Sequence, residues 1–115
     1  MSLEAFRERI LSRTLLRIRG GGSKDFYGGP LAGEPLDVSA YRGIVSYEPS
    51  ELVVTARAGT SLAELETALA ERGQWMAFEP PSFGGAATLG GAMASGLSGP
   101  GRARYGALRD FVLGV

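Results

Sequence analysis

Residues 15–24 have the sequence LLRIRGGGSK, in which a short alternating stretch runs directly into three consecutive glycines. Alternation of Leu16 and Ile18 with arginines is typical of a half-buried strand. The loop that follows can turn several backbone N–H groups toward one point and so form a nest for an anion. The stretch therefore predicts a strand that ends in a candidate pyrophosphate cradle, made of Arg19, Gly20, Gly21, Gly22, Ser23 and Lys24.

This glycine loop fits neither of the two common nucleotide-binding patterns. The Rossmann pattern G-x-G-x-x-G fails because Asp25 stands where the third glycine is required. The P-loop pattern fails because Ser23, and not a glycine, precedes the lysine. Taken alone, the loop is also compatible with a plain turn between a strand and a surface loop. Support for a ligand therefore depends on a second feature of the sequence.

That second feature is the region 84–106, which holds eight of the 18 glycines of the chain. Thr88 is a suitable cap for a short helix of small residues that extends to Ser95. Gly90 and Gly91 would leave the first N–H groups of this helix exposed, and a helix N-terminus stabilises a phosphate. A flexible loop without a ligand is the alternative. Long structureless loops are unusual in a small domain, however, and are more often functional.

Composition excludes several classes of function. The 115 residues are 44% hydrophobic and 21% charged, which fits one small folded domain or part of a larger one. Acidic and basic residues balance at 12 each, so no nucleic-acid surface is expected. The chain has no cysteine or histidine, which excludes disulfides, thiolate or imidazole metal sites and a serine–histidine–aspartate triad. The lack of a long apolar run and of a signal peptide favours a cytoplasmic location.

The carboxylates form no pair at a defined spacing. Glu79 beside Pro80 and Asp110 beside Arg109 are isolated along the chain, and we expect them to be solvated or salt-bridged surface charges. The sequence therefore predicts no acid–base pair, no catalytic residue and no metal site.

Local patterns predict an α+β chain with a small mixed sheet flanked by helices. Helices are expected over 3–14, 61–72 and 88–95, capped by Ser2, Ser61 and Thr88. Strands are expected over 15–19, 44–47, 52–58 and 75–78, the middle two as a hairpin, with a further extended stretch at 36–38. Residues 111–115 also have the composition of a strand. Its unpaired edge would invite pairing with a second copy of the chain, and so a homodimer.

The order of several motifs resembles the FAD-binding domain of the vanillyl-alcohol-oxidase and para-cresol-methylhydroxylase (PCMH) type. RGGGSK at 19–24 is followed by VTARAGTSLAEL at 54–65, TLGG at 88–91 and RYG at 104–106. Within this family, FEPP at 78–81, GLSGP at 96–100 and RDFVLG at 109–114 resemble the FAD-binding subunits of bacterial glycolate oxidases. The resemblance covers residues 15–115.

The resemblance implies a non-covalent FAD held between two α+β subdomains, since no histidine or cysteine is available for a covalent link. The implied cofactor contacts are Arg19, Gly20, Gly21, Gly22, Ser23, Lys24, Pro81, Thr88, Leu89, Gly90, Gly91, Ser95, Ser98, Gly99, Arg104 and Tyr105. The first six and Thr88 to Gly91 would approach the pyrophosphate from two sides, and the later residues would lie toward the flavin. Ala92 departs from the pattern, because many members have asparagine there.

The function implied by the resemblance is oxidation of a 2-hydroxy acid, glycolate, to the 2-oxo acid. The chain would act in a complex with another flavin subunit and an iron–sulfur subunit, in the cytoplasm or at the inner membrane surface through that complex. Residues 1–115 would be the N-terminal part of the FAD domain, without its second subdomain or a substrate domain, and inactive alone. The alternatives are an enzyme of the same family for lactate, an aldonolactone or a sugar nucleotide, and a non-enzymatic interaction module.

Overall fold

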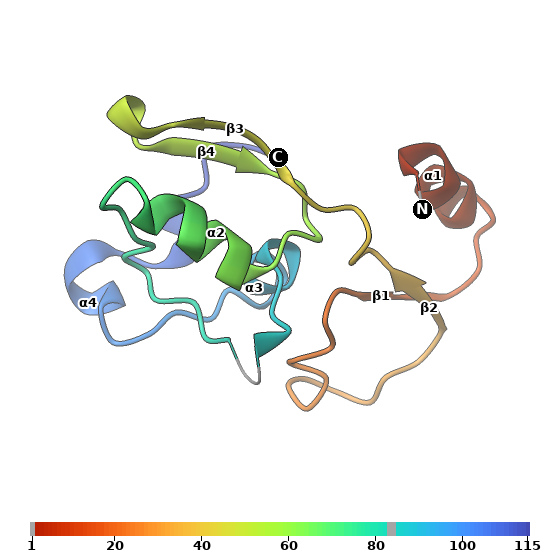
Figure 1. Ribbon diagram of the computed structural model, residues 1–115. Coiled ribbons are helices and arrows are strands. Elements are labelled where there is room, and N and C mark those ends of the chain that lie inside the picture. The colour runs from red at the N-terminus through yellow and green to blue at the C-terminus, as the bar shows by residue number, and fades with distance from the viewer. Residues whose placement is uncertain (1, 83–84) are drawn as a thin grey trace.

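The computed structural model describes residues 2–82 and 85–115, which form two small sheets and several short helices (Figure 1). In chain order the elements are α1 (Leu3–Leu11), β1 (Leu16–Arg19), β2 (Glu34–Asp37), β3 (Ile44–Glu48), the 3₁₀ turn η1 (Pro49–Glu51), β4 (Val53–Ala56), α2 (Leu62–Ala70), α3 (Leu89–Ser95), α4 (Arg102–Tyr105) and the 3₁₀ turn η3 (Leu108–Asp110). No helix formed by these described residues is long and apolar enough to cross a bilayer.

The N-terminal part consists of α1 and the parallel pair β1–β2, which lie together on one side of the molecule (Figure 1). The hydroxyl oxygen of Ser2 caps α1 by accepting the Ala5 N–H at 3.2 Å, as its position in the sequence predicted. The buried ring of Phe6 lies edge-on to the ring of Tyr41, with centroids 6.1 Å apart. The helix ends sooner than predicted because Arg13 adopts a left-handed conformation with φ of 59°.

The predicted hairpin is confirmed as β3 and β4, which pair antiparallel around η1. The turn ends at Leu52, a non-glycine residue with φ of 59°. Gln74, beyond the end of α2, ties the hairpin to the rest of the fold, because its side chain accepts from the Tyr47 hydroxyl and donates to the Pro49 carbonyl. Figure 1 shows the hairpin above α2 in consequence.

The core lies between α2, α3 and η3. The apolar stripe of α2, formed by Leu62, Leu65 and Leu69, is buried, and Leu62 joins a cluster with Phe78, Ala87, Ala92 and Leu108. The Ser61 hydroxyl oxygen caps α2 by accepting the Glu64 N–H at 3.1 Å, as predicted. The Glu64 carboxylate pairs with Arg42 at 3.1 Å.

Thr60, which is fully buried, joins the N-terminal part to the core. Its hydroxyl oxygen accepts the Gly43 N–H at 2.9 Å, and the hydroxyl donates to the Gly43 carbonyl at 3.2 Å. Gly59 donates its N–H to the Tyr41 carbonyl at 2.7 Å. These bonds hold the segment that follows β2 against the segment that precedes α2. They thereby fix the position of β1 relative to α3.

The predicted sheet is wrong in two places. The strands expected at 15–19, 44–47 and 52–58 form, but in two separate pairs, with β2 as the partner of β1. Residues 75–78 form no strand, because the chain turns there, with the Glu79 N–H bonded to the Met76 carbonyl, and inserts Phe78 into the core. An apolar run has the same composition whether it pairs as a strand or packs as a core segment.

Residues 111–115 also form no strand. The ring of Phe111 packs on Phe78 with centroids 5.3 Å apart, and Leu113 and Val115 are exposed. Among the residues that the structure describes, no strand is paired with this segment. The edge strand on which a homodimer was predicted is therefore not present.

Candidate functional site

A cleft of about 340 Å³ lies between the glycine loop that follows β1 and the first turns of α3. Of the residues predicted to contact a cofactor, it is lined by Arg19, Gly20, Gly21, Gly22, Ser23, Lys24, Thr88, Gly91 and Ser95. Two regions singled out separately in the sequence are thus brought face to face by the fold. Of the second glycine-rich region, Gly91 is the glycine that lines the cleft, and the role of the two loops in binding a ligand stays a prediction.

Two glycines of the loop are needed because the loop packs directly on the segment before α3. A Cβ atom on Gly20 would lie 2.5 Å from the Thr88 hydroxyl oxygen, and one on Gly21 would overlap the carbonyl oxygen of Ala86. Gly22 has φ of 71°, a conformation that side chains rarely adopt. Gly20 and Gly21 are therefore required for close contact within the protein, and Gly22 is required for the turn of the loop.

The backbone donors of the glycine loop are free. Within the described part of the chain, none of the N–H groups from Gly20 to Lys24 donates a hydrogen bond. Buried or half-buried N–H groups normally have partners, and successive free ones form a concave site for an anion. The carbonyls of this loop are used instead, since Asp25 donates to Gly22 and Tyr27 donates to Lys24. The loop thus lines the cleft with unbonded donors, while two of its carbonyls are bonded within the chain.

Positive charge converges on the same cleft. The Lys24 ammonium lies 3.8 Å from the place a Cβ would occupy on Gly91, beside the first turn of α3. Desolvation in this half-buried position lowers the pKa of Lys24. The Arg19 guanidinium folds over Gly22, while the carboxylate of Asp25 also lines the cleft. An ammonium and the positive end of a helix repel each other, so an anion between them would stabilise both.

The start of α3 differs from its predicted role. The Leu89 N–H donates to the Thr60 carbonyl and the Gly90 N–H to the Ala58 carbonyl, both at 2.8 Å. The Gly91 N–H donates to the Thr88 hydroxyl oxygen at 3.1 Å, which is the predicted cap. The expectation that Gly90 and Gly91 expose free donors is therefore wrong for both, and the missing side chain of Gly90 instead allows close packing on Ala58.

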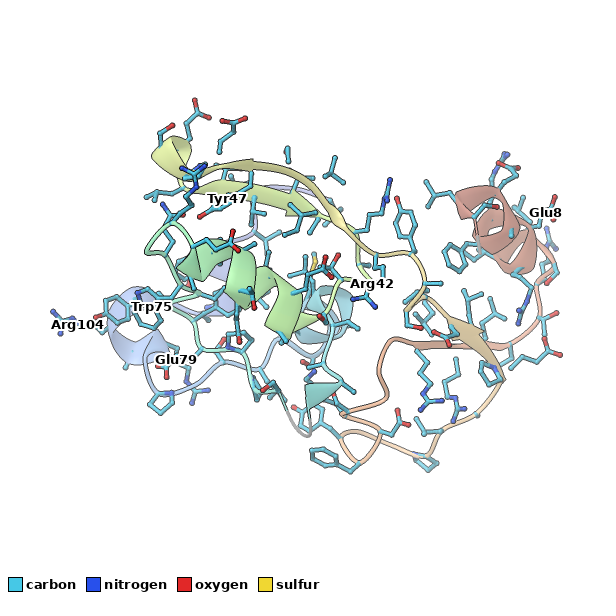
Figure 2. All side chains as sticks on the ribbon, in the orientation of Figure 1. Glu8, Arg42, Tyr47, Trp75, Glu79 and Arg104 are labelled. Atoms are coloured by element: carbon cyan, nitrogen blue, oxygen red, sulfur yellow. The ribbon has the colours of Figure 1, made fainter. Side chains whose placement is uncertain are left out.

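Seven of the predicted contacts do not line this cleft: Leu89 and Gly90, whose N–H groups are bonded within the fold, and five more distant residues. Pro81 and Gly99 line a second hollow of about 680 Å³ beside Trp75. The Ser98 hydroxyl oxygen accepts the Leu108 N–H at 3.1 Å. The other two are Arg104 and Tyr105 on α4, and Figure 2 shows Arg104 beside Trp75, far from the N-terminal part. The structure does not bring these residues together with the glycine loop.

Apolar and aromatic residues of the cleft were missed by sequence reasoning. Ile18, Tyr27, Leu31 and Ala94 line it. Tyr27 and Leu31 come from the long connection between β1 and β2, where no periodic pattern marks a side chain as facing a ligand. Only their closeness in sequence to the glycine loop was a signal. Ala94 lies on α3 one turn beyond Gly91, a spacing that could have indicated it.

A protein-family model described as an FAD binding domain matches residues 8–115. The chain belongs to this family. Escherichia coli (strain K12) glycolate oxidase subunit GlcE is 51% identical over 113 residues, which are 98% of this chain and 32% of GlcE. The chain therefore spans about a third of the length of this relative. Alkyldihydroxyacetonephosphate synthase has the same fold, with a TM-score of 0.69 at 21% identity over 95% of this chain and 22% of that chain.

The family assignment confirms the predicted fold and the predicted cofactor. FAD is the cofactor of this FAD-binding domain, and its diphosphate is a compact anion. The chemistry of the cleft fits that group, because consecutive free N–H groups and the Lys24 ammonium are donors, and Lys24 and Arg19 outnumber the single carboxylate of Asp25 that lines it. Covalent attachment through histidine or cysteine is excluded by the sequence of this chain.

Proposed function

We propose that the cleft holds the diphosphate of FAD and that residues 1–115 supply the N-terminal part of a PCMH-type FAD-binding domain. The observation that carries this proposal is the run of free N–H groups from Gly20 to Lys24, which faces the start of α3. These groups would donate to the phosphate oxygens, and Arg19 and Lys24 would offset their charge. Thr88 and Gly91 would close the opposite wall, while Leu89 and Gly90 would position that wall.

The other predicted contacts belong further along the cofactor. Ser95 lies at the end of α3 within the same cleft, and its hydroxyl donates to the Ala92 carbonyl at 3.2 Å, which leaves its oxygen able to accept. We propose that an extended FAD leaves the cleft here, toward the segments that contain Pro81, Ser98, Gly99, Arg104 and Tyr105. Family resemblance and the direction of α3 support this path.

The proposed reaction is oxidation of a 2-hydroxy acid, glycolate, to the 2-oxo acid. It is supported by the 51% identity to a protein named as a glycolate oxidase subunit. When bound, FAD supplies the redox chemistry by accepting a hydride from the hydroxyl-bearing carbon while the hydroxyl proton is lost. The residues of this chain bind and orient the cofactor, and none is proposed as catalytic. A substrate panel that includes lactate separates glycolate oxidation from the other activities of the family.

We further propose that the protein works in a complex with another flavin subunit and an iron–sulfur subunit, in the cytoplasm and at the inner membrane surface through that complex. The word subunit in the name of the relative supports an assembly. Co-purification from cells followed by iron and flavin analysis tests this. Association of two copies through 111–115 would require apolar contacts in place of strand pairing, and light scattering at high concentration measures it.

Substitution of Gly22 by aspartate tests the diphosphate site directly. A carboxylate at this position would lie in the donor nest, beside the Arg19 guanidinium, which must shift, and the positive φ of Gly22 strains any side chain. We expect Gly22→Asp to raise the Kd for FAD by about tenfold or more, because like charges would oppose each other at close range. Gly28→Asp is the matched control, since Gly28 also has a positive φ, nothing lies within 4 Å of a Cβ there and the same charge is added. Equal Kd values for both variants would overturn the proposal.

A further inference from the structure

Two carboxylates bracket the short helix α4. The Oε1 atom of Glu79 accepts the Gly101 N–H at 2.6 Å, immediately before α4. The Oδ2 atom of Asp110 accepts the Ala107 N–H at 2.9 Å, just beyond the other end. Both residues are exposed, as expected for surface charges, and each carboxylate also binds a backbone donor. Charged hydrogen bonds of this kind are stronger than neutral ones.

The glycines around α4 are fitted to these carboxylates. A Cβ on Gly101 would overlap the Glu79 carboxylate oxygen, and a Cβ on Gly106 would lie 2.9 Å from the Asp110 oxygen. Gly99 packs on the stem of Glu79 in the same way and donates its N–H to the Glu79 carbonyl at 2.9 Å. The absence of a side chain at three glycines thus leaves space for the two acidic side chains: Gly99 and Gly101 for Glu79, and Gly106 for Asp110.

Glu79 joins two segments that are distant in sequence. Its backbone has φ of 49°, an unfavourable conformation for a non-glycine residue, and it leads directly into Pro80 and Pro81. Its carboxylate and carbonyl both bind the segment 99–101 that leads into α4. Figure 2 shows Glu79 on the same side of the molecule as Trp75 and Arg104.

Contacts at the far side of α4 complete this arrangement. The ring of Tyr105 lies edge-on to the ring of Trp75, with centroids 5.7 Å apart, and the Arg104 guanidinium lies 5.4 Å from the Tyr105 ring centroid. The two side chains proposed to approach the flavin are therefore ordered relative to the helix. The position of the helix depends in turn on the bonds at its ends.

We propose that Glu79 is a positioning residue for the cofactor: it holds Pro81, Gly99 and α4 as one rigid unit, so that their contacts with FAD form together. This inference rests on the proposed function, since these residues reach FAD only if its flavin end lies beside them. Asp110 acts in the same way at the other end of α4. Neither residue touches the reacting atoms.

The first test measures the bond without FAD. Hydrogen exchange of the backbone amides of 101–107 is followed in the protein without cofactor for Glu79→Ala, Glu79→Gln and the control Glu71→Ala. Loss of a charged hydrogen bond is expected to speed exchange in Glu79→Ala by about tenfold. Glu79→Gln keeps an acceptor oxygen and should stay within about threefold of wild type. Exchange in Glu79→Ala equal to that of the Glu71→Ala control would overturn the inference.

The second test measures how tightly the variants bind FAD and in what environment they hold the flavin. The Kd for FAD and the visible absorption spectrum of the bound flavin are compared for the same variants. We expect Glu79→Ala to raise the Kd by about tenfold with an altered flavin spectrum, and Glu79→Gln to restore both. Faster amide exchange together with an unchanged Kd and spectrum would overturn the positioning role while leaving the diphosphate site intact. Failure of the wild-type protein to bind FAD would overturn the proposed function first, and this inference with it.

A second variant, Gly101→Ala, tests the same hydrogen bond in case Glu79→Ala does not fold. The added methyl group would displace the Glu79 carboxylate without removing it. If the bond between the Gly101 N–H and the Glu79 carboxylate positions the cofactor, Gly101→Ala should raise the Kd for FAD as Glu79→Ala does. The double variant should then have a Kd no higher than that of either single variant. Additive effects of the two substitutions on the Kd for FAD would contradict a shared role.

Discussion

The α-carbon of Gly21 lies against the carbonyl oxygen of Ala86 so closely that no side chain can be added between them. The glycine loop and the segment before α3 therefore meet backbone to backbone. This contact sets the width of the cleft, because both of its walls continue directly from it. The position of the loop is fixed by covalent geometry and packing before any ligand is considered.

Gly21→Ala is expected to be strongly destabilising for this reason. The new methyl group cannot move away as the end of a flexible side chain would, so the two segments must separate. We expect a loss of about 1–3 kcal/mol in the free energy of unfolding, as for other overpacked sites. Urea denaturation measures it, with Gly29→Ala as a control in open space. Equal midpoints for the two variants would show that the two walls do not touch in solution.

Lys24→Met should weaken FAD binding with little effect on folding. The ammonium lies 3.8 Å from the place of a Cβ on Gly91, beside the start of α3, and its loss would remove a charge-assisted contact to the diphosphate. We expect the Kd for FAD to rise by about tenfold at low salt, and the difference to shrink at high salt if exposed charges contribute. Lys24→Arg should retain most of the affinity. Calorimetric titration with FAD and with ADP separates a diphosphate effect from a flavin effect.

Asp37 should make stability fall in acid. The Ser39 side chain and the Ser39 N–H, the latter at 2.9 Å, bond to the Asp37 carboxylate and lower its pKa. A carboxylate with a lowered pKa contributes stability that is present above its ordinary pKa and is lost as the pH falls through its folded pKa. Asp37→Asn should therefore flatten the acid side of the stability curve below about pH 4. Ser39→Ala, which keeps the N–H donor, should flatten it less. Curves of the same shape for all three proteins would refute this assignment.

Leu52 should be replaceable with a gain in stability. It has φ of 59° at the end of the hairpin turn and is 78% exposed, so little burial offsets its left-handed conformation. Asparagine tolerates that conformation better, and Leu52→Asn is expected to stabilise the fold by about 0.5–1 kcal/mol. The neighbouring Glu51→Asn, in the 3₁₀ turn, should bring no gain. Thermal melts of the two variants provide the comparison, and a lower melting temperature for Leu52→Asn would contradict the expectation.

Local signals in the sequence were sufficient to predict α1, α2, α3 and the hairpin, but not α4. Ser2, Ser61 and Thr88 cap the helices they were expected to cap, because a cap depends only on the next few residues. Strand pairing depends on distant partners, and there prediction failed at 75–78. Phe78 belongs to the core whether or not its backbone pairs, so its apolar neighbours did not distinguish the two outcomes.

The sequence predicted the two loops of the candidate site, but not which protein atoms their glycines contact. The excess of glycine indicated close approach, and the structure shows that Gly20, Gly21 and Gly90 approach other backbone or side-chain atoms of the protein. A sequence cannot distinguish that from approach to a ligand, because both exclude a Cβ. The hydrogen bond of the exposed Glu79 was not predicted for a related reason, since its partner, Gly101, is identified only by the fold.

The contact between Gly21 and Ala86 also has a consequence for the order of folding. The hairpin and α2 need only neighbours in sequence, whereas the cleft exists only after residue 21 has met residue 86. Contacts between such distant residues form late, because closing the long intervening loop is entropically unfavourable. The cleft is then the last part of the chain to assemble. A dinucleotide present during refolding would speed the final phase only, and the early appearance of helical signal would be the same with or without it.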